Sequence, residues 1–215
     1  DNEAASYIID KITQTESGQF LPQKQFKNWY RKRYQLNDFF QSAGYSQLNI
    51  TQKTFPIPYL DEYGKRPQGK DLQMRHLGKH DANNPIRNKL TTWHAARLMY
   101  EIINDQAISP QSSQEIQSYL ERDLNSQVWK NIDPRFEFNP VRAFFGESLP
   151  TDIKFLSKAG WTSSTRQEVA YIETPDQKTR YILAIFAEDQ AYAKNWDIFP
   201  ELSKSAFEQM TKSTN

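Results

Sequence analysis

Three strand-like apolar runs occupy the last third of the chain, after a long stretch of helical patterns, and this order limits the possible folds. The runs lie at residues 153–156, 168–173 and 180–188 and are rich in branched and aromatic side chains. Residues 174–177, Thr-Pro-Asp-Gln, carry a turn signal between the second and third runs, which predicts a hairpin. Helices followed by a three-strand antiparallel meander and a closing helix indicate an α+β fold.

Apolar residues recur at helical spacing in several segments, and helix-capping residues mark some of their ends. Thr91-Thr92 and Ser109-Pro110 are good helix starts, and Gly44 is well placed to end a helix. Between residues 45 and 90 regular periodicity is lost, and such a long excursion is typical of a site or an interface. We therefore predict helices at about 1–13, 36–43, 93–104, 109–124 and 200–212.

The composition excludes several kinds of protein. A chain of 215 residues can form one well-buried domain or a large part of one, and 27 Lys+Arg nearly balance 26 Asp+Glu. No apolar run is long enough to cross a membrane as a helix. Without a cysteine the chain has no disulfide, no thiolate metal site and no cysteine nucleophile.

Two short motifs give the chain a family resemblance. Asp1-Asn2 opens the first amphipathic helix, and Lys158-Ala159-Gly160 follows the first strand-like run. In order and context they resemble the S-D-N and K-T-G motifs of the serine β-lactamases and penicillin-binding proteins. The resemblance implies that residues 1–215 are the C-terminal part of one β-lactamase/transpeptidase-like domain, with insertions at about 14–35 and 50–90. Its N-terminal strands and S-x-x-K helix are then expected upstream of this chain.

The resemblance also implies roles for individual residues. Asp1 and Asn2 would belong to the catalytic S-D-N motif, with the Asn2 side chain binding the substrate amide. Lys158 would add positive charge near the substrate carboxylate, while Ala159 and Gly160 would let the substrate pair closely with the strand. Arg166, from the next strand, is a further candidate for binding the carboxylate.

The function that the resemblance implies is that of a serine hydrolase acting on β-lactams or peptidoglycan-like peptides through an acyl-enzyme. Such a protein would work outside the cytoplasm and need no metal or other cofactor. We expect no nucleic-acid partner, and the oligomeric state stays open.

The chain also departs from the family pattern. Ser-x-x-Lys occurs nowhere in it, so these residues alone cannot carry out the acylation. Asp61 and Glu62 fall in the excursion where a deacylating Glu would lie, but no E-x-x-x-N pattern follows. Ala159 replaces the hydroxyl residue of K-T-G. These departures favour penicillin-binding or peptidase-like activity over fast β-lactam turnover, and they leave a non-catalytic binding module on the same fold as the alternative.

Other signals are better explained by structure than by function. Residues 64–71 nearly spell a phosphate-binding G-x-x-x-x-G-K-[ST] loop, but Asp71 replaces the hydroxyl residue. His76 and His80 have metal-ligand spacing, yet Gly78 between them weakens a helix. His94 lies in an apolar helix and is expected to be a packed histidine with a local hydrogen bond.

The segment 26–34 mixes basic and aromatic residues in a way that would suit stacking on nucleobases. The same composition describes an amphipathic helix whose Lys and Arg stems cover aromatic side chains. Because the net charge is close to zero, we favour the amphipathic helix.

Overall fold

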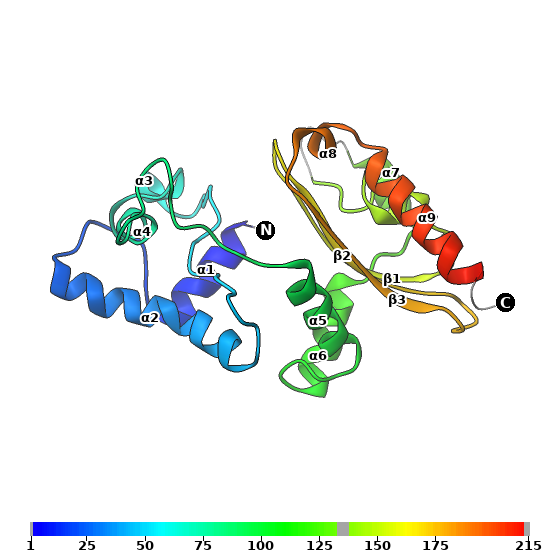
Figure 1. The fold of residues 1–215 in the computed structure, drawn as a ribbon, viewed down its shortest axis with the longest axis horizontal. Coiled ribbons are helices and arrows are strands. Elements are labelled where there is room, and N and C mark those ends of the chain that lie inside the picture. Colours follow the sequence, from blue (N-terminus) through cyan, green and yellow to red (C-terminus); the bar gives the residue numbers. More distant parts are fainter. Residues whose placement is uncertain (1, 133–137, 213–215) are drawn as a thin grey trace. The chain divides into compact units, whose positions relative to one another are not determined.

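The computed structural model describes residues 2–132 and 138–212. The chain forms two compact units, Asp1–Leu90 and Thr91–Asn215, which are described separately below (Figure 1). The α+β prediction is confirmed, because the three strands and the closing helix occur in the expected order. No helix in the described ranges is long and apolar enough to span a membrane.

The first unit is built from helices and long connections. Its helices are α1 (Asn2–Thr13), α2 (Gln23–Ser42), α3 (Asp61–Gly64) and α4 (Gly69–Arg75). The sequence predicted a short helix at 36–43, whereas the basic-aromatic segment and that helix form one continuous α2. No Gly or Pro interrupts residues 23–42, so nothing breaks the helix. Gly44, at φ 90°, lies in the left-handed region just after the helix, as predicted.

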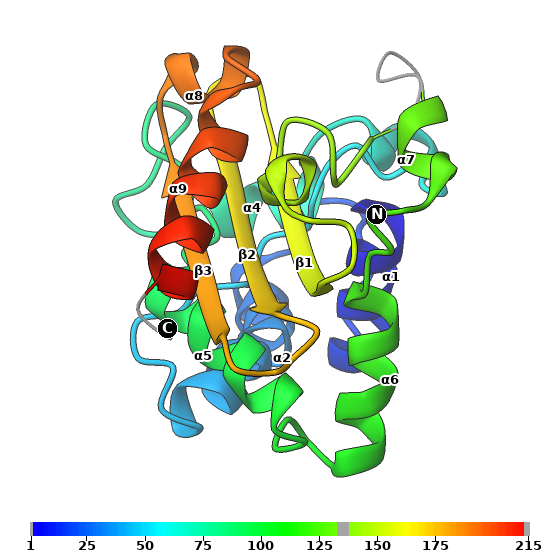
Figure 2. The ribbon, with the colours of Figure 1, turned by 90° about the vertical axis from the view of Figure 1, so that its right-hand side faces the viewer.

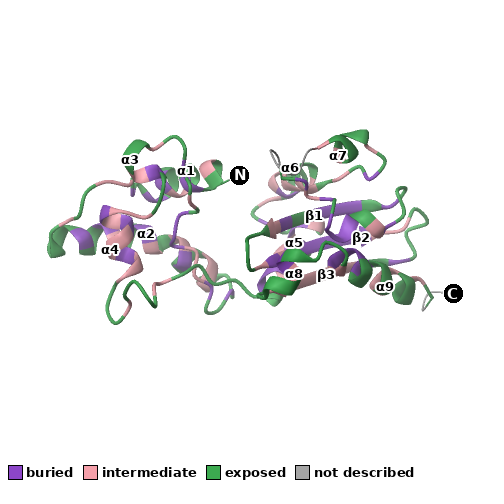
Figure 3. Ribbon diagram, turned by 90° about the horizontal axis from the view of Figure 1, so that it is seen from above, coloured by how far each residue is buried: buried purple, intermediate pink, exposed green. Residues whose placement is uncertain are grey.

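The face of α2 that points inward carries aromatic and charged residues together. Phe26 and Trp29 are buried with Met74 in a small apolar cluster. One turn further on, Arg33 is completely buried as well. Lys24 and Lys27 of the same helix are exposed, which agrees with the predicted amphipathic helix. Figure 3 shows buried and exposed positions alternating along α2.

The second unit contains an antiparallel sheet in the order β1-β2-β3. Its strands are β1 (Lys154–Trp161), β2 (Arg166–Glu173) and β3 (Arg180–Ala187), and Thr174 and Thr179 close the predicted hairpin. The sequence placed Lys158-Ala159-Gly160 at the exit of a strand that ended near residue 156. Instead β1 continues through the motif, because all eight of its residues pair with β2.

Helices cover both faces of this sheet. The unit holds α5 (Thr92–Ile103), α6 (Pro110–Leu120), α7 (Gln127–Asn131), the 3₁₀ turn η1 (Phe145–Ser148), α8 (Gln190–Lys194) and α9 (Ile198–Lys212). The Thr91 and Ser109 side chains cap α5 and α6, as the sequence predicted. Ala95 and Met99 of α5 pack against one face. Phe199 of α9 packs against the other face. Figure 2 shows α9 lying along that face of the sheet.

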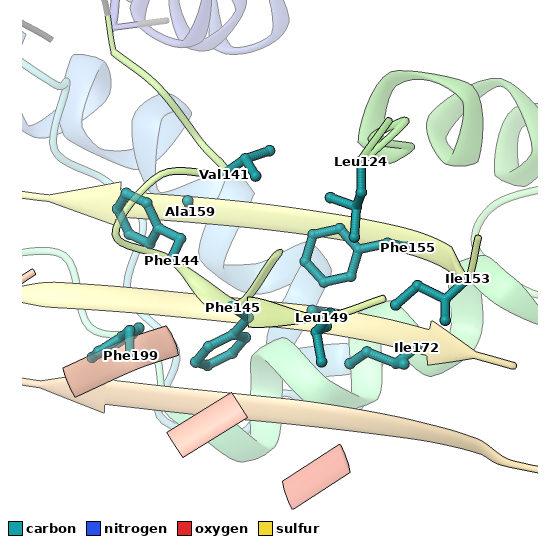
Figure 4. Packing of buried hydrophobic residues seen from close by; sticks show 11 residues of the cluster. Leu124, Val141, Phe144, Phe145, Leu149, Ile153, Phe155, Ala159, Ile172 and Phe199 are labelled. Atoms are coloured by element: carbon teal, nitrogen blue, oxygen red, sulfur yellow. The ribbon is translucent and has the colours of Figure 1, made fainter. Parts of the chain in front are cut away.

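The main apolar core lies on the α9 face of the sheet. Phe145 and Phe199 stack with ring centroids 5.2 Å apart, and Phe155 and Ile172 extend the cluster along the strands (Figure 4). Gly146 belongs here for lack of space, because a Cβ at this position would lie 2.9 Å from Leu124 and 3.0 Å from Phe155. The core therefore fixes η1, and η1 in turn lies against β2.

Candidate functional site

Asn2 begins α1, and its side chain is bonded to the long excursion of the first unit. Asn2 Nδ2 donates a hydrogen bond to the Phe55 carbonyl oxygen at 3.3 Å. One turn later Ser6 Oγ donates to the Thr54 carbonyl at 3.0 Å and accepts from Thr54 N at 3.2 Å. Residues 54–55 are thus fixed beside the start of α1. Asp1, the other predicted residue of this motif, lies outside the described residues.

The segment held by Asn2 and Ser6 carries no carboxylate. Residues 51–58 read Thr-Gln-Lys-Thr-Phe-Pro-Ile-Pro, and Phe55 is half-buried beside Asn2. Asp61 and Glu62, the acids considered from the sequence, lie further on in the first turn of α3. Neither acid belongs to the segment that is bonded to α1.

A buried network of charged residues includes Lys53 and so contacts the segment 51–58. Arg33 donates to Asp10 at 3.4 Å and to Asp71 at 3.3 Å, and Lys53 pairs with the other oxygen of Asp10. Ser17 joins the network by accepting from Lys53 Nζ at 2.8 Å and donating to Asp71 at 2.5 Å. Because Lys53 lies two residues before Phe55, this network positions the chain that Asn2 contacts.

Burial shifts the protonation equilibria of the network. Desolvation raises the pKa of Asp10, and its hydrogen bond and attraction to Lys53 oppose that shift. Desolvation lowers the pKa of Lys53, against the attraction of Asp71 and Asp10. The pKa of the Tyr59 hydroxyl, which donates to Asp10, is raised by desolvation and by the Asp10 charge. The buried charges therefore depend on one another for their ionised state.

In the second unit, Lys158 lies on the edge strand of the sheet. Its side chain is exposed, and its ammonium donates to the Ala159 carbonyl at 2.6 Å. Desolvation lowers the pKa of Lys158, the Arg122 guanidinium lowers it further, and Glu168 opposes the shift. Among the described residues, Glu121 bridges to this edge at Leu156 and no further strand pairs with β1 beyond that point. Lys158 thus marks an open strand edge.

Ala159 and Gly160 differ in their surroundings. Ala159 is buried in the α9-side core, so it can meet a ligand only through its backbone. Gly160 is half-buried, and a Cβ there would meet just the flexible end of Gln167 at 3.0 Å. Because side chains alternate along a strand, Gly160 shares the Lys158 face of the sheet.

Arg166 does not share that face. Arg166 pairs with Trp161, so its side chain points to the same side as Glu168 and Ala170, opposite to Lys158. The guanidinium is buried and donates to the carbonyls of Ala143, Tyr192 and Ala193. It also lies over the Phe144 ring at 5.0 Å. This placement indicates that Arg166 ties the segment just before η1, and α8, to the sheet, a structural role that the sequence did not suggest.

Two charged residues near Lys158 were missed from the sequence. Glu168 is completely buried, accepts from Phe145 N at 2.7 Å, and has its pKa raised by burial to about 8. Arg122 donates to the Ser157 carbonyl at 3.4 Å and to Tyr119 at 2.8 Å. An acid directly before the apolar residues 169–172 of β2 was a usable signal for Glu168, whereas nothing in the sequence singled out Arg122.

The remaining candidates are explained locally. The helix α4 ends at Arg75, so His76 and His80 do not share a helix face. No group of three or more His, Cys, Asp or Glu suited to a metal occurs in the described part of the chain. His94 is buried, and its Nδ1 accepts from Thr91 N at 3.4 Å, which confirms the predicted packed histidine.

A family model described as "Beta-lactamase enzyme family" matches residues 31–210. The chain belongs to this family. The matched residues include Lys158, Ala159 and Gly160, whereas Asn2 precedes them.

Two solved structures are similar to this chain. A β-lactamase from Sphaerobacter thermophilus DSM 20745 superposes with a TM-score of 0.52 at 18% identity, covering 82% of this chain and 52% of that one. A mutant of PBP-A, described as an acyl-enzyme complex with penicillin G, gives a TM-score of 0.49 at 16% identity, covering 82% and 51%. The chain therefore spans about half the length of these structures. No curated protein matches it.

Proposed function

We propose that this chain is the substrate-binding part of a serine acyl-transfer enzyme that acts on β-lactams or peptidoglycan-like peptides. The observation that carries the proposal is the family match over a strand edge on which Lys158 is exposed. In this proposal residues 1–215 belong to one β-lactamase/transpeptidase-like domain, with insertions at about 14–35 and 50–90. The remaining strands and the S-x-x-K helix come from sequence upstream of Asp1.

The proposed reaction has two steps. The upstream serine hydroxyl adds to the amide carbonyl of the substrate, the C–N bond breaks, and the leaving nitrogen takes up a proton. Water then cleaves the resulting ester and restores the serine. Asn2 would hold the substrate amide, as the Asp1-Asn2 motif suggests, and Lys158 would attract the substrate carboxylate.

The open edge of β1 suits this role physically. A strand edge presents unpaired N–H and C=O groups that can bind an extended peptide or an amide-containing ring. Gly160 keeps side-chain bulk away from the Lys158 face, and the Lys158 ammonium on that face can attract an anion. We propose no carboxylate-binding role for Arg166, because its donors are used within the core.

The absence of a carboxylate from residues 51–58 favours slow deacylation. Activation of a water molecule requires a base within hydrogen-bond reach of it, and the segment that Asn2 contacts offers none. We therefore propose that the acyl-enzyme persists, as in a penicillin-binding or peptidase-like protein. Action outside the cytoplasm is part of the same proposal.

A labelled penicillin tests the proposal directly. The protein with its upstream sequence is incubated with the label, and the adduct is located by mass spectrometry of peptides. We expect one ester adduct on the upstream serine, formed within minutes and lost over hours. If no acylating probe labels that serine, the chain is instead a non-catalytic binding module on the same fold.

A further inference from the structure

A polar hollow of about 390 Å³ lies in the first unit, away from Asn2. One wall comes from α2 through Tyr34 and Asn37, and the other comes from the end of the excursion through His80, Arg87 and Lys89. None of the lining residues is acidic. The hollow is therefore concave and carries positive charge, a combination that suits an anion.

The walls of the hollow are fixed by hydrogen bonds. Asn49 and Lys89 exchange backbone hydrogen bonds of 3.0 and 2.7 Å, which join the two walls. The Asn49 side chain donates to the Arg87 carbonyl at 3.2 Å and accepts from Asn37 at 3.0 Å. Gln41 donates to the Leu48 carbonyl at 2.8 Å. These side-chain amides fix the backbone around the hollow. Arg87 and Lys89 are attached to this fixed backbone, and their side chains are exposed.

Arg87 brings a charge that the described residues do not neutralise. No ion pair or side-chain hydrogen bond of its guanidinium is found among them, and Lys89 Nζ contacts only the neutral Gln47, at 3.3 Å. Asp81, the acid nearest to Arg87 in the sequence, accepts from the backbone of Asn83 and Asn84.

A second arginine, Arg75, lies close to Arg87. The Arg75 carbonyl accepts from Ile86 N at 2.7 Å, which brings the end of α4 next to Arg87. The pKa of Arg75 is lowered by desolvation and then by the charge of Arg87. Two like charges held together raise the free energy of the fold unless an anion binds between or beside them.

We propose that this hollow binds a phosphate-class oxyanion, with Arg87 as its principal contact, Lys89 as a second cation and Arg75 as supporting charge. Arginine matches phosphate because its planar fork donates two parallel hydrogen bonds to two oxygens. The excess of basic over acidic residues in residues 1–90 adds long-range attraction for such a ligand. The site is separate from the proposed acyl-transfer function and does not depend on it.

Titration with inorganic phosphate at constant ionic strength, followed by calorimetry, tests the site. We expect saturable 1:1 binding with a dissociation constant on the order of 1 mM, weakened about tenfold in Arg87→Gln and about threefold in Lys89→Gln. Lys79→Gln changes another exposed lysine of the same loop that does not line the hollow, and it should bind as the unchanged protein does. Equal weakening in all three variants, or no saturable binding, would overturn the proposal.

Two further measurements separate binding from folding and phosphate from other anions. Without phosphate, Arg87→Gln should unfold at the same temperature as the unchanged protein or higher, because the variant relieves the repulsion of Arg75. A lower unfolding temperature would show that Arg87 is structural and would contradict the site. Acetate should bind about tenfold more weakly than phosphate, and equal affinity would overturn the assignment of the ligand class.

Discussion

The interiors of the two units are held together in opposite ways. In the first unit Arg33, Asp10, Lys53 and Asp71 form a buried network of opposite charges. In the second unit stacked aromatic rings and apolar strand residues fill the core, and Glu168 is a buried acid among them. A charged interior depends on every partner being present, whereas an apolar core depends on shape and volume. Different kinds of substitution should therefore destabilise the two units.

Removing Arg33 should have the largest effect. Arg33→Met leaves Asp71 buried without its paired cation and Asp10 with Lys53 alone, which should destabilise the first unit by about 3–5 kcal/mol. Hydrogen exchange of the α2 amides in increasing urea measures this loss, while the amides of β2 should be unaffected. Arg31→Met, at an exposed position on the same helix, is the matched control and should change stability by less than about 0.5 kcal/mol. Similar losses in both variants would show that the network contributes little.

Glu168 differs from the paired charges of the first unit, because its ionised form destabilises the fold. Its pKa is about 8 in the fold and 4.5 without the protein environment, so the folded chain retains a proton that the unfolded chain releases. The second unit should therefore lose stability as the pH rises from about 4.5 to about 8.

Glu168→Gln keeps the shape and an acceptor for Phe145 N but cannot ionise. We expect this variant to gain about 2 kcal/mol over the unchanged protein at pH 8 and to match it near pH 5. Hydrogen exchange of the β2 amides at both pH values provides the measurement. Glu188→Gln, at an exposed position, should leave the pH dependence as it is. A Gln variant that is less stable at pH 8 would mean that the carboxylate is stabilised in its charged form.

A substitution on the open edge of β1 tests substrate binding and leaves the interiors of both units intact. Gly160→Val places a branched side chain on the Lys158 face, where a Cβ meets only the mobile end of Gln167. We expect unchanged stability and acylation by penicillin that is about tenfold slower. Lys154→Val, four residues before Lys158 and on the same face of β1, should leave the rate within about twofold. Equal slowing in both variants would show that the face matters only for folding.

The sequence predicted the features of the fold that depend on residues close together in the chain. Thr91, Ser109 and Gly44 mark helix ends by their own chemistry, and the hairpin at residues 174–179 follows from its turn residues. The length of β1 could not be predicted, because its pairing partner lies further along the chain and Lys158-Ala159-Gly160 has a weak strand pattern.

The site was harder to predict, because it depends on which face of an element is buried. Both faces of β2 are covered, so its sequence does not show that Arg166 is buried on the same face as Glu168. Arg33 lies in a run of basic residues, and only the packing of α1 and the excursion around α2 separates it from exposed Arg31. Contacts between distant segments decide both cases.

The central claim is that the positive charge of Lys158, on the open edge of β1, attracts the substrate carboxylate. Lys154 offers a matched control, because it is an exposed lysine on the same strand and the same face. In the protein with its upstream sequence, the second-order rate constant of acylation by a labelled penicillin is measured for Lys158→Gln and Lys154→Gln. We predict a loss of about tenfold to a hundredfold for Lys158→Gln and less than twofold for Lys154→Gln. Equal rates in the two variants would contradict the account.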